Sequence, residues 1–175
     1  MSITYPSRVY REKEVMDLWN KHNEHYPFLM RKDRSHLPVE SRGEGIYLLA
    51  FDGEQAVGYT GWVDKDDHFK TAGVEVLPEY RDKKVAARLM VKRTEKFTKP
   101  TVAVFNNPAS GWSNHWKSRG WLTVDQAAGQ IDQSILDAYS RFKRTTLVYV
   151  PDGMTKAWNI LCPVTDEEVL KFEEM

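Results

Sequence analysis

The 175-residue sequence contains one cysteine, Cys162. A single thiol excludes an internal disulfide framework and a cysteine metal cluster, and it is typical of a reducing compartment. An excess of one charge is also missing, because 25 Lys and Arg residues balance 25 Asp and Glu residues. A nucleic-acid binder is normally basic over at least one face, so no nucleic-acid partner is expected. No apolar run approaches the length of a membrane span and the first residues contain no apolar signal core, which predicts a cytoplasmic protein without a membrane partner.

Catalytic motifs of several enzyme classes are missing too. The chain has no Ser-His-Asp order, no CxxC pair, no HExxH and no Walker-type loop, so hydrolase, metalloenzyme and NTPase interpretations gain no support. A hydrophobic content of 41% and a charged content of 29% are typical of an ordinary globular protein. We find no internal repeat, low-complexity tract or linker, and therefore expect residues 1–175 to form a single domain.

The most informative stretch is residues 71–90, where a strand pattern leads through a turn into a helix pattern. A β-branched run at residues 74–76 indicates a strand, Pro78 a turn, and apolar residues at helical spacing from Val85 onward a helix. The intervening residues 81–84 include three cations. A helix N-terminus concentrates backbone N–H groups and the positive end of the helix dipole, so this arrangement attracts anions. We predict a phosphate-bearing ligand here; the alternative is a surface connection with solvated lysines.

Periodicity and turn signals predict the other elements. Asp52-Gly53 is a hairpin signal between two strand patterns. The pattern at residues 125–142 indicates an amphipathic helix that covers an acceptor groove, contacts a partner or extends the core. The expected helices cover residues 12–25, 125–142 and 166–174, with one more leading to Gly120, and the expected strands cover residues 45–51, 55–63, 72–76, 101–105 and 143–150.

At residues 76–86 the sequence resembles the GNAT acyltransferases. Their pyrophosphate loop reads Val-x-Pro-x-Tyr followed by Arg/Gln-x-x-Gly-x-Gly/Ala. The matching residues are Val76, Pro78, Tyr80, Arg81 and Ala86. Lys84 stands where the family has its first loop glycine, which lets the backbone approach the ligand closely.

A second segment follows in the family's order. It carries Asn106 with Ala109, then His115-Trp116, and then Gly120-Trp121, where Gly120 suits a helix C′ position of positive φ. Trp116 falls where many of these enzymes have a tyrosine that is held to protonate the departing thiolate. An indole N–H is no comparable acid, so Trp116 is expected only to shape the thiol end of the site.

The resemblance covers roughly residues 9–150 and implies an α/β fold of the α+β type. We expect one GNAT-like domain with a mixed, mostly antiparallel twisted sheet flanked by helices. The sequence adds an extra helix between the last two strands and a C-terminal helix in an extension of residues 151–175. That extension is expected either to pack on the core or to hold a second copy in a homodimer.

The activity implied by the resemblance is transfer of an acetyl or other acyl group from acetyl-CoA, the cosubstrate, to an amine. The expected coenzyme A contacts are Val76, Arg81, Asp82, Lys83, Lys84, Val85, Ala86, Ala87 and Asn107. The competing class is a GNAT-like protein that no longer catalyses and serves in binding or assembly, for which internal virion proteins of some tailed phages are a precedent. Lys84 and Trp116 favour this second class, whereas Arg81 and Ala86 favour the enzyme.

Glu75 is the first candidate for the general base. An alkyl ammonium has a pKa near 10.4, so the acceptor needs a carboxylate or imidazole to collect its proton. Glu75 alternates with Val74 and Val76 along the strand, and some GNAT enzymes keep a glutamate in this neighbourhood. The alternative is an edge-exposed or salt-bridged carboxylate. His115 and His68 are weaker candidates.

Overall fold

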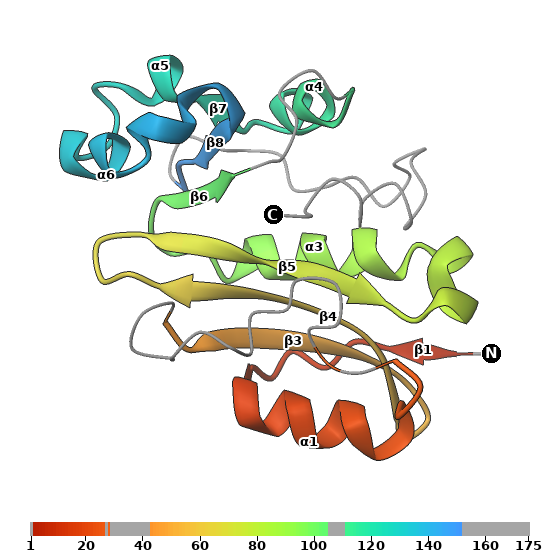
Figure 1. The fold of residues 1–175 in the computed structure, drawn as a ribbon. Coiled ribbons are helices and arrows are strands. Elements are labelled where there is room, and N and C mark those ends of the chain that lie inside the picture. The colour runs from red at the N-terminus through yellow and green to blue at the C-terminus, as the bar shows by residue number, and fades with distance from the viewer. Residues whose placement is uncertain (1, 27, 29–42, 105–110, 152–175) are drawn as a thin grey trace.

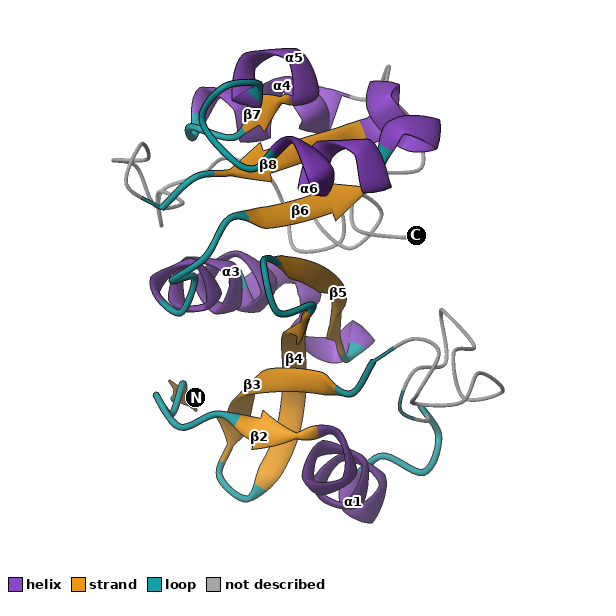
Figure 2. Ribbon diagram, turned by 90° about the vertical axis from the view of Figure 1, so that its left-hand side faces the viewer, coloured by secondary structure: helices purple, strands orange, loops and turns teal. Residues whose placement is uncertain are grey.

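The strands form a single eight-stranded sheet in the computed structural model, which describes residues 2–26, 28, 43–104 and 111–151. Figure 1 shows the strands in the order β1-β3-β4-β5-β6-β8-β7, and β2, labelled in Figure 2, pairs with β3. All neighbours are antiparallel except β5 and β6, which are parallel. The strands are β1 Ile3–Thr4, β2 Tyr10–Arg11, β3 Gly45–Asp52, β4 Gln55–Asp64, β5 Phe69–Val76, β6 Thr101–Val104, β7 Leu122–Thr123 and β8 Thr146–Tyr149. The expected mixed, mostly antiparallel sheet flanked by helices is confirmed.

Two helices cover opposite faces of the sheet at β4. These are α1 (Glu12–His22) and α3 (Val85–Glu95). Tyr59 packs edge-on against Trp19 of α1, with ring centroids 5.1 Å apart. Gly58 faces α3, and a Cβ there would lie 3.0 Å from Val85 Cγ1. Because neighbouring strand residues point to opposite faces, the absent side chain of Gly58 lets α3 approach the sheet closely.

Arg93 is a buried cation at an irregularity in the sheet. The β4–β5 register shifts between Thr60 and Trp62. Arg93, on α3 and only 1% exposed, donates from Nη1 to Thr60 Oγ1 (3.0 Å) and to the Gly61 carbonyl (3.3 Å). A bulge interrupts the regular ladder, so a side chain from the covering helix supplies hydrogen bonds that the ladder does not.

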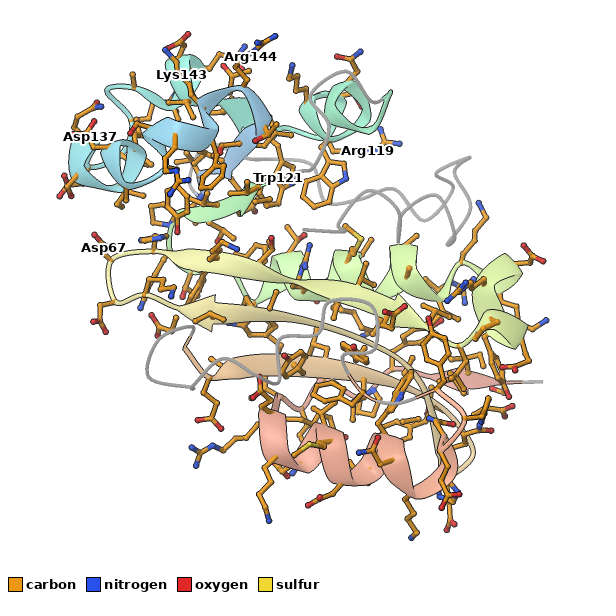
Figure 3. All side chains as sticks on the ribbon, viewed as in Figure 1. Asp67, Arg119, Trp121, Asp137, Lys143 and Arg144 are labelled. Atoms are coloured by element: carbon orange, nitrogen blue, oxygen red, sulfur yellow. The ribbon has the colours of Figure 1, made fainter. Side chains whose placement is uncertain are left out.

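Strands β6, β8 and β7 form the second half of the sheet. Figure 2 shows the helices that follow α3 around these strands. The ring of Phe97, which follows α3, packs against the rings of Trp121 and Tyr149 in this half. The three centroid separations are 5.6–6.4 Å. Trp121 is labelled in Figure 3 beneath α4. The elements here are α4 (Gly111–Ser118), α5 (Val124–Ala127), α6 (Gln133–Ala138) and the 3₁₀ helix η2 (Ser140–Thr145).

The insertion between the last two strands is not the single helix expected at residues 125–142. It consists of α5, α6 and η2 instead. Gly129 has φ = +87°, which ends the helical path, and Asp132 then caps α6 by accepting from the Ser134 amide at 3.0 Å. The expected strand at residues 143–150 begins only at Thr146, because residues 140–145 belong to η2.

Other expected boundaries shift for local reasons. Helix α1 ends at His22 rather than at residue 25, because the buried side chain of Asn23 donates to the Ala56 carbonyl (2.8 Å) and draws the chain toward β4. The hairpin at Asp52-Gly53 is confirmed. The expected helix at residues 166–174 lies outside the described residues. No helix among those described combines the length and the apolar character that a membrane crossing requires.

His68 links the insertion to the central sheet. Its Nδ1 lies 2.6 Å from Asp67 Oδ1, and its Nε2 lies 2.6 Å from the Tyr139 hydroxyl. Burial, with a smaller contribution from Asp67, raises the pKa of Tyr139 to about 12, so the phenol stays neutral and hydrogen-bonded. His68 therefore makes a structural contact, and a role for it as a general base remains a prediction.

Replacing Trp121 by Ala tests whether the aromatic cluster holds the two halves together. Trp121 is 2% exposed, so Trp121→Ala is expected to lower the free energy of unfolding by about 3–5 kcal/mol. Phe142, 41% exposed in the same half, is the control: Phe142→Ala should change it by less than about 0.5 kcal/mol. Urea unfolding measures both, and equal losses would contradict this packing.

Candidate active site

Strands β5 and β6 separate after a short parallel stretch. Among the described residues they pair only at Phe69 with Thr101 and at Lys70 with Val102. Strand β5 then continues to Val76 along β4 alone, while β6 continues along β8. The carboxyl ends of the two parallel strands therefore diverge, and the main chain of β5 beyond Lys70 faces the space between them.

The hydrogen-bond alternation of β5 determines which residues face this divergence. The Leu77 amide donates to the Val57 carbonyl at 2.9 Å, so Val57 and Leu77 form a hydrogen-bonded pair. Val76, opposite Gly58, then belongs to a non-hydrogen-bonded pair. Its N–H and C=O point away from β4 and toward the divergence. This is the orientation that a main-chain contact to an extended ligand requires.

A left-handed residue separates the turn from helix α3. The 3₁₀ helix η1 (Pro78–Lys83) follows β5, and Lys84 then adopts φ = +58° and ψ = +30° before α3 begins at Val85. L-residues rarely occupy this region, whereas glycine does so freely. Lys84 therefore keeps the backbone conformation that a glycine would favour at this loop position, at a cost in strain.

The predicted loop residues divide into two groups. The side chains of Val85, Ala86 and Ala87 are buried, so only their main chain can face a ligand. Asp82 and Lys83 are exposed and Lys84 is half-buried, beside the positive end of the α3 dipole. Asn107, Asn106 and Ala109 lie outside the described residues.

Tyr80 anchors the loop to the β3–β4 hairpin. Its hydroxyl donates to Asp52 Oδ2 at 2.7 Å. This hydrogen bond, with desolvation as the smaller cause, raises the pKa of Tyr80 above its usual value. A tyrosine at the loop therefore acts as a structural tie.

Arg81 folds back over the end of β5 rather than projecting from the loop. Its Nε donates to the Val76 carbonyl (3.0 Å), and its Nη2 donates to the Tyr26 hydroxyl (2.7 Å). Tyr26 in turn donates to Glu75 Oε2 (3.1 Å), which lies 3.8 Å from Arg81 Nη2. The structure thus brings Glu75, Val76 and Arg81 together, and it adds Tyr26.

Sequence reasoning did not identify Tyr26 as a site residue. The Trp19 indole donates to the Tyr26 carbonyl (2.6 Å) and fixes this residue after α1. Tyr26 and Glu75 are 49 residues apart, so no local pattern could have indicated their contact. The side chain of Glu75, whose residue is 4% exposed, points to the α1 face, opposite to α3.

Trp116 lies in the core and apart from the Glu75 cluster. It is fully buried, 4.6 Å from Trp121 between ring centroids. The Trp121 amide donates to the Trp116 carbonyl (3.2 Å), the Gly120 amide donates to the Lys117 carbonyl (3.1 Å), and Gly120 has φ = +101°. This is a Schellman motif with its usual apolar contact, so the predicted helix end at Gly120 is confirmed. A role for Trp116 at a thiol group remains a prediction.

The sequence model of the acetyltransferase (GNAT) family matches residues 10–108, which is more than half of the 175-residue chain. The chain belongs to the GNAT family. The match includes the divergent strands, the loop at Lys84 and the cluster around Glu75. The expected family and fold are therefore confirmed.

Several solved structures are similar to this chain at low sequence identity. An N-acetylglutamate synthase from Neisseria gonorrhoeae, complexed with coenzyme A and N-acetyl-glutamate, is 13% identical over 85% of this chain and 34% of its own, with a TM-score of 0.46. PaiA N-acetyltransferase from Thermoplasma acidophilum, in complex with coenzyme A, is 15% identical over 70% of this chain and 91% of its own (TM-score 0.41). Escherichia coli ElaA is 18% identical over 71% and 89% (TM-score 0.43). No protein of curated function matches this GNAT chain.

Metal chemistry has no candidate ligands in the described part of this GNAT chain, where no group of three or more His, Cys, Asp or Glu residues is placed to hold an ion. The site therefore offers main-chain groups, cations and one buried carboxylate.

Two substitutions of Lys84 test the backbone strain. Lys84→Val places a β-branched residue at φ = +58° and should lower the free energy of unfolding by about 1–2 kcal/mol. Lys84→Gly should leave it unchanged or raise it by up to about 1 kcal/mol. Both remove the same ammonium group, so their difference in urea unfolding reports the conformation alone. Equal stability of the two variants would argue against a left-handed residue here.

Proposed function

We propose that this chain is an N-acyltransferase that moves an acetyl group, or another acyl group, from acetyl-CoA to an amine. The observation that carries the proposal is the divergence of β5 and β6 directly beside the left-handed loop and the start of α3. An extended thioester needs such an open strand edge, and its diphosphate needs the cations and dipole of the loop. Membership in the GNAT family supports the same reaction.

In this proposal the loop holds the diphosphate by charge. Lys83 and Arg88 are exposed and Lys84 is half-buried around the first turn of α3. The main chain of Val76 would contact the pantetheine arm at the strand edge. Arg81 would act as a positioning residue instead of the expected phosphate ligand, because its guanidinium is engaged by Val76 and Tyr26.

Glu75 would accept the proton of the attacking amine. The amine nitrogen forms a bond to the thioester carbonyl carbon, the carbon–sulfur bond breaks, and the proton passes to the carboxylate directly or through one water. A thiol has a pKa near 8.5, so the thiolate leaves at neutral pH without a strong acid. Acyl transfer therefore does not require a tyrosine at position 116, which is Trp116 in this chain. Since Glu75 faces α1, the amine would approach from that side.

A binding or assembly protein without catalysis is the second candidate. The observation that favours it is that the carboxylate of Glu75 is nearly buried and already held by Tyr26 and Arg81. A carboxylate fixed in this way serves structure as well as it serves catalysis. The two candidates differ in whether acetyl-CoA is consumed.

Thermal unfolding with acetyl-CoA tests the binding step. At a thousandfold excess over the Kd, a specific site should raise the free energy of unfolding by about 4 kcal/mol. Lys83→Glu should weaken binding about tenfold, which is about 1.4 kcal/mol, because it reverses a charge at the loop. Lys13→Glu on α1 is the matched control and should bind as the parent does. If acetyl-CoA does not raise the free energy of unfolding of the parent protein, the proposal is contradicted.

Turnover of Glu75→Gln tests the chemical step. Thiol release from acetyl-CoA, measured with a thiol-reactive dye against a panel of primary amines, should fall about 100-fold or more, while the acetyl-CoA shift persists. Tyr26→Phe keeps the ring but removes the hydroxyl that joins Arg81 to Glu75, and should cause a smaller loss. Undiminished turnover in Glu75→Gln would remove it as the base. A persistent shift without turnover of any amine would favour the second candidate.

A further inference from the structure

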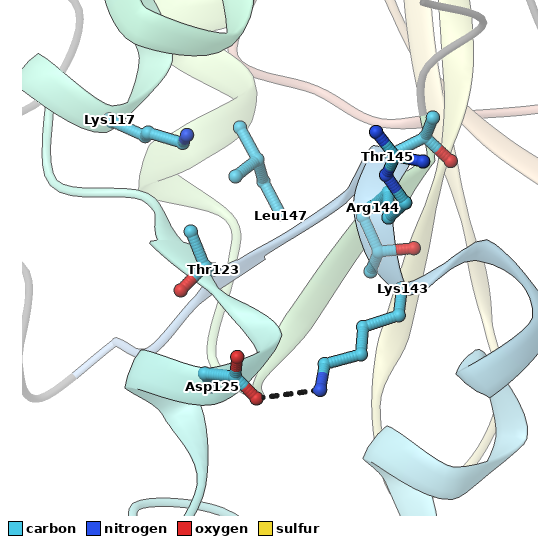
Figure 4. A pocket seen from close by; sticks show the side chains of 8 residues that line it. Lys117, Thr123, Asp125, Lys143, Arg144, Thr145 and Leu147 are labelled. Carbon is cyan, nitrogen blue, oxygen red and sulfur yellow. Dashed lines mark ion pairs between the residues drawn. The ribbon is translucent and has the colours of Figure 1, made fainter. Parts of the chain in front are cut away.

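A second cavity lies away from the divergent strands. It has a volume of about 400 Å³ and opens over the end of β7 and the start of β8, between α4 and η2 (Figure 4). In the sheet, β8 and β7 follow β6 on the side opposite to β5, so this pocket is separate from the proposed cosubstrate cleft. Its lining residues are Lys117, Thr123, Asp125, Lys143, Arg144, Thr145, Thr146 and Leu147.

The pocket carries a positive charge. Lys117 comes from α4, and Lys143 and Arg144 come from η2, so segments 26 residues apart in sequence supply three cations. Asp125 is the one carboxylate among the described lining residues, and it pairs with Lys143 at 2.9 Å (Figure 4). Three cations against one carboxylate give these described residues a net charge of +2. Within the described residues, Lys117 and Arg144 form no ion pair with a carboxylate.

The hydroxyl groups of the lining are largely occupied by the backbone. Thr145 and Thr146 both donate to the Phe142 carbonyl, at 3.1 and 2.7 Å. Thr123 accepts from the Gln126 amide at 3.2 Å, which caps α5. The donors that remain for a ligand are mainly the cationic groups, above the apolar side chain of Leu147. Such a lining discriminates in favour of anions and against neutral polar molecules.

Local structure fixes the backbone segments that carry the cations. The threonine hydrogen bonds fix η2 after the non-helical residue Phe142 (φ = −115°), and Lys143 is tied across the pocket to Asp125. Lys117 follows the buried Trp116, which the Schellman motif fixes against Trp121. Like charges held together repel one another, and an anion that neutralises them stabilises the fold.

We propose that this pocket binds a small organic anion that carries carboxylate or phosphate groups. A volume of about 400 Å³ lies within the range of small-molecule sites. Arg144 presents a planar fork suited to two oxygens of one group, while Lys117 supplies a point charge on the other side. Asp125 competes with the ligand for Lys143 and limits affinity. The site is independent of the proposed acyl transfer.

Isothermal titration calorimetry of the full chain tests the proposal, with sodium phosphate and sodium succinate as the probes at an ionic strength held constant with sodium chloride. We expect saturable binding of at least one probe. Lys117→Ala combined with Arg144→Ala should weaken it at least tenfold. Lys13→Ala combined with Lys21→Ala, which removes two exposed cations from α1, is the control and should bind as the parent does. No binding of either probe, or equal binding by both double variants, would overturn the proposal.

Asp125→Asn gives a result in the opposite direction. It removes the competing carboxylate and releases Lys143, so the probe should bind several-fold more tightly, which a misfolded variant cannot mimic. Weaker or unchanged binding would contradict the proposed site.

Two controls separate this pocket from the loop at Lys84. Lys83→Glu should leave probe binding unchanged, and loss of binding in that variant would assign the anion to the loop instead. The double variant of Lys117 and Arg144 should keep the parent's acetyl-CoA shift. Failure of the anion site and failure of the acyltransferase proposal are therefore distinguishable.

Discussion

The parallel pairing of β5 and β6, which covers two residue pairs in the described part of the chain, is the constraint on which the rest of the structure depends. A sheet that stayed paired to its end would satisfy the main chain of Val76 within the ladder. Because the strands diverge instead, the two halves of the sheet need another connection, and Phe97, Trp121 and Tyr149 supply it through ring packing. The aromatic cluster lets the sheet remain one unit although β5 and β6 diverge.

Arg81 connects the loop, the strand edge and the buried carboxylate. Its three contacts reach Val76, Tyr26 and Glu75, so a change at the loop alters the surroundings of the proposed base. A guanidinium suits this task because its planar donors point in several directions at once, whereas an ammonium is a single point charge. The phosphate contact that the family resemblance implies for Arg81 remains a prediction, and its contacts support the proposal that Arg81 positions Glu75.

Local patterns predicted the elements whose causes are local. Pro78, the helical spacing from Val85 and the glycine at position 120 each act within a few residues, and the corresponding turn, helix and helix end are present. The contacts missed by sequence reasoning join distant positions: Tyr26 meets Glu75 across 49 residues, and Arg93 reaches Thr60 across 33. The prediction of a single helix in the insertion was wrong for a different reason. The helical spacing of apolar residues continues through Gly129, whereas the helical backbone ends there.

The net charge of this chain does not indicate where its cations lie. A formal charge of zero is the basis for expecting no broad basic face, and among the described residues cations lie together at the loop at residues 81–84 and at the pocket formed by α4 and η2. Charges in water are screened beyond about 8–10 Å, so each cluster acts on its own surroundings and the balancing carboxylates elsewhere do not cancel it. Two anion-attracting regions, each proposed to bind its own ligand, are therefore compatible with a neutral protein, and the overall charge balance does not exclude either one.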